Sequence, residues 1–201
     1  MKRLLLATRN AHKAREIQEI LGPEFELRDL TAYPEISEIV ESGKSFEENA
    51  QIKAIAVSKK LPGLVIGDDS GLEAEALGGA PGIYSARYAG KNATDKQNVE
   101  KLLSELAGAG AKARQRKARF RCVITLAQEG ELLGTFEGTV AGTIADCPRG
   151  SRGFGYDPIF VPNGFEQTFA ELPAEVKNRI SHRAEAIRAL AAKLAALKPS
   201  D

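Results

Sequence analysis

The sequence has little cysteine and histidine and no long apolar run. Its two cysteines, Cys122 and Cys147, have no CxxC spacing and no histidine cluster beside them, which argues against a zinc site and a disulfide framework. No stretch is long enough to span a bilayer, and the apolar run near the N-terminus is too short for a signal-peptide core. We therefore expect a reduced, cytoplasmic setting and no membrane partner.

An excess of either charge is also lacking. Lysine and arginine total 28 against 27 aspartates and glutamates, so the net charge of +1 gives no general attraction to nucleic acid. The basic segment 112–121 contains no aromatic residue except Phe120, so we expect a solvated edge rather than a nucleic-acid surface. The 201 residues suit a single domain over 1–201, and any anion binding must be local.

Short apolar runs alternate with helical periods, a pattern that predicts an α/β fold. The predicted strands cover residues 4–7, 64–67, 122–126 and about 132–144. A hairpin at Glu129 and Gly130 is expected to join the last two strands. The predicted helices follow four candidate N-cap residues, namely Asn10, Ser45, Thr94 and Ser181.

Two of these helix starts, Asn10–Lys13 and Ser181–Arg183, contain a histidine followed by a permanent cation. The helix dipole disfavours a cation in the first turn by about 0.3–1 kcal/mol. Exposed cations that are screened by solvent are the alternative, since they cost little. Because the pattern occurs twice, we predict an anion or polar ligand there. Thr8, which joins the first strand to the first of these helices, adds a hydroxyl to a possible phosphate site.

An acidic pair, Asp68 and Asp69, follows the predicted strand 64–67. Mg²⁺ would reconcile two carboxylates with a bound phosphate, whereas the alternative is an Asx turn. Glu41 is a candidate second carboxylate ligand. Asn49 and Lys53 lie one turn apart on the second helix, and they either face the same site or form a solvated helix face. Strand alternation places Asp68 and Asp69 on opposite faces, which leaves their division of roles open.

Five long segments, in order and over nearly the whole chain, resemble the family of inosine and xanthosine triphosphate pyrophosphatases, which remove non-standard purine nucleotides. The segments are ATRNAHKAREI at 7–17, SFEENAQIKA at 45–54, DDSGLEAEALGGAPGIYSARYAG at 68–90, GFGYDPIF at 153–160 and ISHRAEAI at 180–187. Arg9 stands where the family often has glycine, a departure that bears on the phosphate contacts.

The resemblance implies a mixed central β-sheet flanked by helices, with two lobes that enclose an active-site cleft, and a homodimer. It implies Mg²⁺-dependent hydrolysis of ITP, dITP or XTP to the monophosphate and pyrophosphate. Asp69 is the implied general base toward the water that attacks the α-phosphorus, and Glu41 and Asp69 are the implied metal ligands. A carboxylate suits this role because it accepts the proton while the cation offsets charge on the phosphates.

The resemblance also implies substrate contacts in three groups. The triphosphate site comprises Thr8, Arg9, Asn10, Ala11, His12 and Lys13, and Ser70 contacts the substrate. Phe154 stacks on the purine, in a pocket shaped by Gly155, Tyr156 and Asp157. Lys177, His182 and Arg183 supply donors that suit the 6-oxo group of hypoxanthine or xanthine, where adenine presents an amino group.

Two other functions compete with this one. A pyrophosphatase for modified pyrimidine or standard nucleotides would share the chemistry and differ in its substrates. A nucleotide sensor or RNA-binding module would bind phosphate without turnover. The binding module leaves the Asp68–Asp69 pair without a role, so the sequence favours the enzyme.

Overall fold

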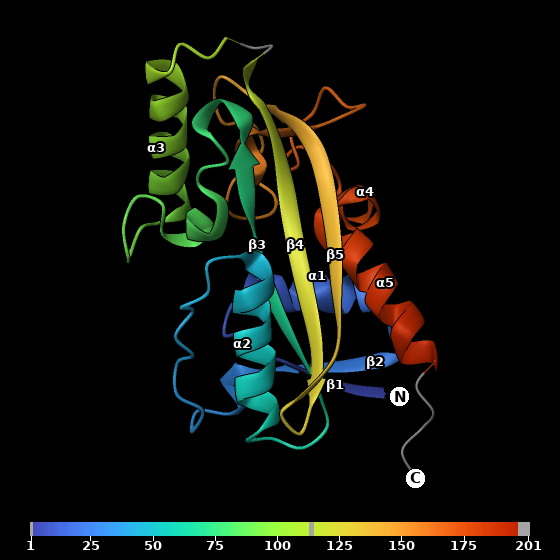
Figure 1. Ribbon diagram of the computed structural model, residues 1–201. Coiled ribbons are helices and arrows are strands. Elements are labelled where there is room, and N and C mark those ends of the chain that lie inside the picture. The colour runs from blue at the N-terminus through green and yellow to red at the C-terminus, as the bar shows by residue number, and fades with distance from the viewer. Residues whose placement is uncertain (1, 113–114, 197–201) are drawn as a thin grey trace. The chain divides into compact units, whose positions relative to one another are not determined.

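The computed structural model describes residues 2–112 and 115–196, and it confirms the predicted α/β fold (Figure 1). Its α-helices are α1 (Ala11–Leu21), α2 (Phe46–Ser58), α3 (Asp95–Gly108), α4 (Ala174–Ile180) and α5 (His182–Ala196). Its strands are β1 (Lys2–Leu6), β2 (Phe25–Asp29), β3 (Leu64–Ala74), β4 (Lys117–Gln128), β5 (Glu131–Ile144) and β6 (Phe160–Pro162). None of the helices in the described part of the chain combines the length and apolarity that crossing a membrane requires.

Within the described residues, six strands form one sheet in the order β2-β1-β3-β4-β5-β6. Strand β1 runs parallel to both β2 and β3, whereas β5 and β6 are antiparallel, so the sheet is mixed as predicted. Strands β4 and β5 are joined at Glu129 and Gly130, whose φ angles are 52° and 85°. Positive φ at both central residues is typical of a type I′ turn, and the predicted hairpin is confirmed.

The chain divides into two compact units with separate cores. Unit 1 comprises Met1–Asp69, Cys122–Gly138 and His182–Asp201, and unit 2 comprises Ser70–Arg121 and Thr139–Ser181. In unit 1, apolar side chains from β1, α1, β3, β4 and α5 pack together, with Ile17, Ile66 and Leu190 fully buried among them. In unit 2, residues of α3 pack with an aromatic cluster of Phe120, Phe160 and Phe169. The unit boundary falls within β3, β4 and β5.

The helix starts follow the predicted caps. Asn10 accepts hydrogen bonds from the backbone N–H of His12 at 3.0 Å and of Lys13 at 3.1 Å, which satisfies two donors of α1. Ser45 caps α2 through the backbone N–H of Glu48. Thr94 forms a reciprocal capping box on α3. Helix α5 begins at His182, directly after Ser181.

Gly67 allows α2 to lie directly against β3. A Cβ atom at this position would be 2.2 Å from the Ala50 carbonyl oxygen and 2.9 Å from the Ala54 backbone nitrogen, both on α2. Backbone atoms cannot move aside as a flexible side chain would. The glycine therefore sets the distance at which α2 presents its side chains to the residues that follow on β3.

Gly67→Ala is expected to reduce the free energy of unfolding by about 1–3 kcal/mol, because the added methyl group overpacks the contact between α2 and β3. Urea denaturation measures the change. Gly108→Ala is the matched control, since a Cβ there meets nothing within 4 Å and the residue is the last of α3. Equal stability of the two variants would contradict the role of Gly67 in helix placement.

Two expectations from the sequence were wrong in detail, and one strand was missed. Strand β3 does not end at Gly67 but continues to Ala74, so Asp68 and Asp69 lie within a strand. Strand β2, with the sequence FELRD, was not predicted because it has no buried apolar alternation. The basic segment is not a solvated edge throughout: Lys117 begins β4, and the Arg116 guanidinium is buried against the Ala111 carbonyl and Asp146. Residues 113–114 of this segment lie outside the described residues.

Candidate functional site

Asp68 and Asp69 are consecutive residues of β3 with different partners in unit 1. Asp68 contacts Lys13 and Arg183, from α1 and α5, whereas Asp69 contacts α2. These contacts agree with the alternation of side chains along a strand, which directs the two carboxylates to opposite faces. The pair thus divides into two sites with different chemistry.

Asp69 is held by two side chains of α2. The Asn49 amide donates to Asp69 Oδ2 at 3.2 Å, and the Lys53 ammonium lies 3.1 Å from Asp69 Oδ1. Lys53 also donates to Glu41 at 2.8 Å, and Asn49 accepts the backbone N–H of Gly43 at 2.9 Å. Asn49 is fully buried and Lys53 is 6% exposed, so a solvated helix face is wrong for both. The helix joins the Glu41 segment to Asp69.

Burial raises the pKa of the Asp69 carboxyl above its ordinary value, while the nearby Lys53 ammonium opposes this shift. Burial alone would lower the pKa of Lys53, but Asp69 and Glu41 outweigh it and the net pKa is raised, so Lys53 stays protonated. A carboxylate with a raised pKa is a better proton acceptor. Asp69 therefore has the properties of a general base, held in place by a fixed cation.

Asp68 is 1% exposed and is contacted by donors from α1, α5 and β4. Lys13 Nζ is in direct contact with it, Arg183 Nε lies at 3.4 Å, and the Cys122 thiol donates at 3.1 Å. Burial alone would raise the pKa of Asp68, but Lys13 and Arg183 hold it well below its usual range. Burial, followed by the charge of Asp68, raises the pKa of Cys122. Asp68 thus stays ionised between two cations that lower its pKa, which suits it to holding structure rather than accepting a proton.

The two cations at the helix starts meet the same anion, and that anion belongs to the chain. Lys13 from α1 and Arg183 from α5 both pair with Asp68, and Nη1 of Arg183 also pairs with Glu16. Arg183 is 1% exposed. Gly138 allows α5 to start close to β5, because a Cβ there would lie 2.1 Å from the His182 carbonyl oxygen. The start of α5 is therefore fixed by charge on one side and by close packing on the other.

The predicted triphosphate residues form the turn between β1 and α1. Thr8 accepts the backbone N–H of Asn10 at 3.2 Å through its hydroxyl and the backbone N–H of Leu30 at 2.9 Å through its carbonyl. Ala11 and His12 are exposed in the first turn of α1. Arg9 donates to the carbonyls of Leu30 and Ile36. The segment presents a short exposed turn with its conformation fixed by local hydrogen bonds.

The predicted purine residues of unit 2 are organised around Asp157. Its Oδ2 accepts from the backbone N–H of Phe154 at 2.9 Å and from Lys177 Nζ at 2.5 Å. The Lys177 ammonium lies 5.1 Å from the centroid of the Phe154 ring, a cation–π distance. Gly155 donates its backbone N–H to Asp95 at 2.7 Å. Lys177, which the sequence alone would make a solvated residue, is 6% exposed and lies on α4.

Tyr156 anchors this loop to the core of unit 2. Its ring is 4% exposed, and its hydroxyl donates to the Ser85 carbonyl at 2.9 Å. Burial raises its pKa well above the ordinary value, so the hydroxyl stays protonated and available for this bond. A cavity of about 290 Å³ is lined in part by Phe154, Gly155 and Val99. Ser70, the first residue of unit 2, follows Asp69 on β3.

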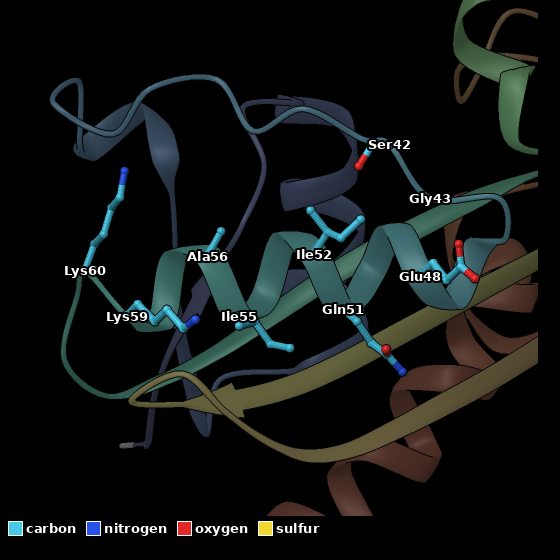
Figure 2. Close-up of a pocket in the computed structure, with 9 residues that line it drawn as sticks. All are labelled: Ser42, Gly43, Glu48, Gln51, Ile52, Ile55, Ala56, Lys59 and Lys60. Atoms are coloured by element: carbon cyan, nitrogen blue, oxygen red, sulfur yellow. The ribbon is translucent and has the colours of Figure 1, made fainter.

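A larger depression, of about 690 Å³, lies along α2 (Figure 2). Its lining comprises Ser42, Gly43, Glu48, Gln51, Ile52, Ile55, Ala56, Lys59 and Lys60. The lining includes neither Asn49 nor Lys53, so α2 presents different side chains to this depression and to Asp69. The volume of a depression therefore does not identify the functional site, which is identified by the chemistry of its side chains.

The donor set near Asp69 fits a hard divalent cation shared with a ligand. Among the described residues, no three histidine, cysteine, aspartate or glutamate side chains form a group that could bind a metal unaided. Glu41 and Asp69 both contact the Lys53 ammonium, so two carboxylates lie around one position. Mg²⁺ commonly uses one or two carboxylates together with substrate phosphates, and this pair suits that arrangement.

Sequence reasoning missed two residues of the Asp68 network. Glu16 lies one turn after Lys13 on α1, a spacing that could have indicated a shared helix face. Cys122 lies within an apolar strand, and nothing in the sequence marks it as a donor to Asp68.

A protein-family model described as the Ham1 family matches residues 4–193 of the sequence. The chain belongs to the Ham1 family. A Ham1 relative from Bacillus subtilis (strain 168), named dITP/XTP pyrophosphatase, is 49% identical over 191 residues, which cover 94% of this chain and 96% of the relative. The resemblance inferred from the motifs is thus confirmed.

Solved Ham1 structures show the same fold. A HAM1 protein from Coxiella burnetii has a TM-score of 0.86 and 41% identity, covering 98% of this chain and 100% of that chain. A nucleoside-triphosphatase / dITP/XTP pyrophosphatase from Mycobacterium abscessus has a TM-score of 0.74 and 42% identity, covering 94% of this chain and 98% of that chain. The predicted mixed α/β sheet is therefore shared with known members of the family.

Proposed function

We propose that this chain hydrolyses the non-standard purine nucleoside triphosphates ITP, dITP and XTP to the nucleoside monophosphate and pyrophosphate. The observation that carries the proposal is Asp69, a buried carboxylate with a raised pKa beside the Lys53–Glu41 pair. The relative of this chain from Bacillus subtilis, at 49% identity, is named for this substrate class. The reaction removes these nucleotides from the pool before they enter DNA or RNA.

In the proposed reaction, Asp69 accepts a proton from a water molecule whose oxygen attacks the α-phosphorus. The bond between the α-phosphorus and the oxygen that bridges to the β-phosphorus breaks, and that oxygen leaves with pyrophosphate. Lys53 and Asn49 hold the Asp69 carboxylate in position, with one donor at each oxygen. Positioning of this kind contributes to the rate in addition to proton transfer.

Glu41 and Asp69 are the proposed ligands of Mg²⁺, which when bound would neutralise charge on the phosphates. The triphosphate is assigned to Thr8 and to residues 10–13, at the N-terminus of α1, where the helix dipole favours an anion. Ser70 is assigned a substrate contact beside Asp69. Lys13 adds positive charge to this region even while it pairs with Asp68.

The purine is assigned to Phe154, with Gly155, Tyr156 and Asp157 supporting its loop. Lys177 and His182 are the proposed donors to the 6-oxo group, because adenine presents an amino donor rather than an acceptor at that position. Arg183 pairs with Asp68 and Glu16. Its contribution to base recognition remains a prediction. Two lobes that enclose a cleft likewise stay a prediction.

The experiment that tests this function compares pyrophosphate and orthophosphate release from ITP, XTP, GTP and ATP with Mg²⁺. The proposal expects pyrophosphate release from ITP and XTP, at rates well above those for GTP and ATP. Equal rates with the four nucleotides would favour a pyrophosphatase of standard nucleotides. Nucleotide binding without release would favour a sensor or RNA-binding module.

A homodimer in the cytoplasm, where the nucleotide pool is used, completes the proposal. Family resemblance supports the dimer, and sedimentation equilibrium over a range of protein concentrations tests it. A monomer at every concentration would contradict the proposed dimer and leave the proposed reaction unaffected.

A further inference from the structure

Arg9 has specific partners within the chain. It lies between β1 and α1, at the surface of unit 1. One terminal nitrogen of its guanidinium donates to the Leu30 carbonyl and the other to the Ile36 carbonyl. Both terminal nitrogens are thus directed to the chain itself.

These carbonyls belong to the segment that links β2 to α2 and contains Glu41. After a single 3-10 turn at Leu30–Ala32, residues 33–45 form neither helix nor strand. A guanidinium is a planar fork of fixed geometry, so donating to two carbonyls six residues apart sets the path of the backbone between them. The backbone N–H of Leu30 also donates to the Thr8 carbonyl at 2.9 Å.

The other end of this segment is fixed by α2. Gly43 donates to Asn49 and Glu41 accepts from Lys53, at 2.9 and 2.8 Å. Between the two anchored ends lie residues 37–40, where Val40 is 77% exposed. Among residues 37–40, Ile39 packs in part against the core of unit 1 and the others are exposed, so the Arg9 contacts at residues 30 and 36 add to what limits the position of Glu41.

We propose that Arg9 is a positioning residue that fastens the segment containing Glu41 to the turn after β1, and that it acts on Mg²⁺ binding through Glu41 rather than by contacting phosphate. The role assigned to Glu41 rests on the proposed function. The fastening itself rests on the two carbonyl contacts alone.

The test uses Arg9→Met, which keeps the aliphatic stem, and Arg9→Lys, which keeps the charge but cannot bridge two carbonyls as a fork. Arg15→Met on the exposed face of α1 is the control. Hydrogen exchange of the full chain without nucleotide is expected to show amides of residues 37–44 exchanging about tenfold faster in both Arg9 variants, from the loss of two charged hydrogen bonds. The control is expected to match the unsubstituted chain.

Activity measurements on the same proteins complete the test. The Mg²⁺ concentration for half-maximal ITP hydrolysis is expected to rise about tenfold in both Arg9 variants, with KM for ITP at saturating Mg²⁺ unchanged. The proposal would be overturned if Arg9→Lys exchanged at the same rate as the unsubstituted chain. It would also be overturned by a raised KM for ITP with unchanged hydrogen exchange, and Arg9 would then be assigned to phosphate contact. Failure of the proposed function appears separately, as no pyrophosphate release by the unsubstituted chain.

Discussion

Asp69→Asn is expected to lower kcat for pyrophosphate release from ITP by about 10²–10⁴-fold, the usual contribution of general acid–base catalysis. Asparagine has nearly the same shape but cannot accept the proton of the attacking water. The folded state should survive, because Lys53 keeps its contact with Glu41 and the substitution removes a buried charge. Initial rates give the loss of turnover, and urea denaturation reports whether the protein remains folded.

The control is Asp146→Asn, whose side chain is 80% exposed and pairs with Arg116 at the surface of unit 2. Its kcat is expected to equal that of the unsubstituted chain. A decrease of less than about tenfold for Asp69→Asn would show that proton transfer to Asp69 is not required. Asp68 would not replace Asp69 as the base, because Lys13 and Arg183 hold the pKa of Asp68 well below its usual range.

Arg183→Met is expected to reduce the free energy of unfolding by about 3–5 kcal/mol, because it leaves buried carboxylates without their partner. Asp68 would keep its contact with Lys13, and Glu16 would lose its contact with the Arg183 guanidinium in the interior of unit 1. Methionine fills much of the volume of the arginine stem. The loss of stability therefore reflects the removed charge rather than a cavity. Urea denaturation measures it.

Arg3→Met provides the comparison for this stability prediction. Arg3 pairs with Glu26, but its side chain is 79% exposed, and such surface pairs contribute about 0–1 kcal/mol. A loss of stability as small for Arg183→Met as for Arg3→Met would contradict the account of a buried network around Asp68. Such a small loss would leave substrate contact as the remaining role of Arg183.

The fold could be predicted wherever a local signal was strong. Asn10 and Thr94 mark helix starts because a side-chain cap uses residues close in sequence, and Glu129–Gly130 marks a hairpin for the same reason. The end of β3 could not be predicted from charge, because the partners that allow Asp68 and Asp69 to remain in a strand come from distant helices. Strand β2 is partly buried and carries almost no hydrophobic period.

The candidate site shows the same limit. The sequence predicted that an anion or polar ligand lies near Lys13 and Arg183. In the structure both cations pair with Asp68, an anion of the same chain. Arg9 stood out only as a departure from the family pattern, since backbone carbonyls such as that of Ile36 leave no mark in a sequence. Residue types indicated the chemistry, whereas the pairing of these residues required the fold.

The reaction itself is tested most directly by hydrolysing ITP with the unsubstituted chain in water enriched in ¹⁸O and analysing both products by mass spectrometry. Attack by an Asp69-activated water on the α-phosphorus predicts one ¹⁸O atom in inosine monophosphate and none in pyrophosphate. Label in pyrophosphate, or release of orthophosphate in place of pyrophosphate, would contradict the account.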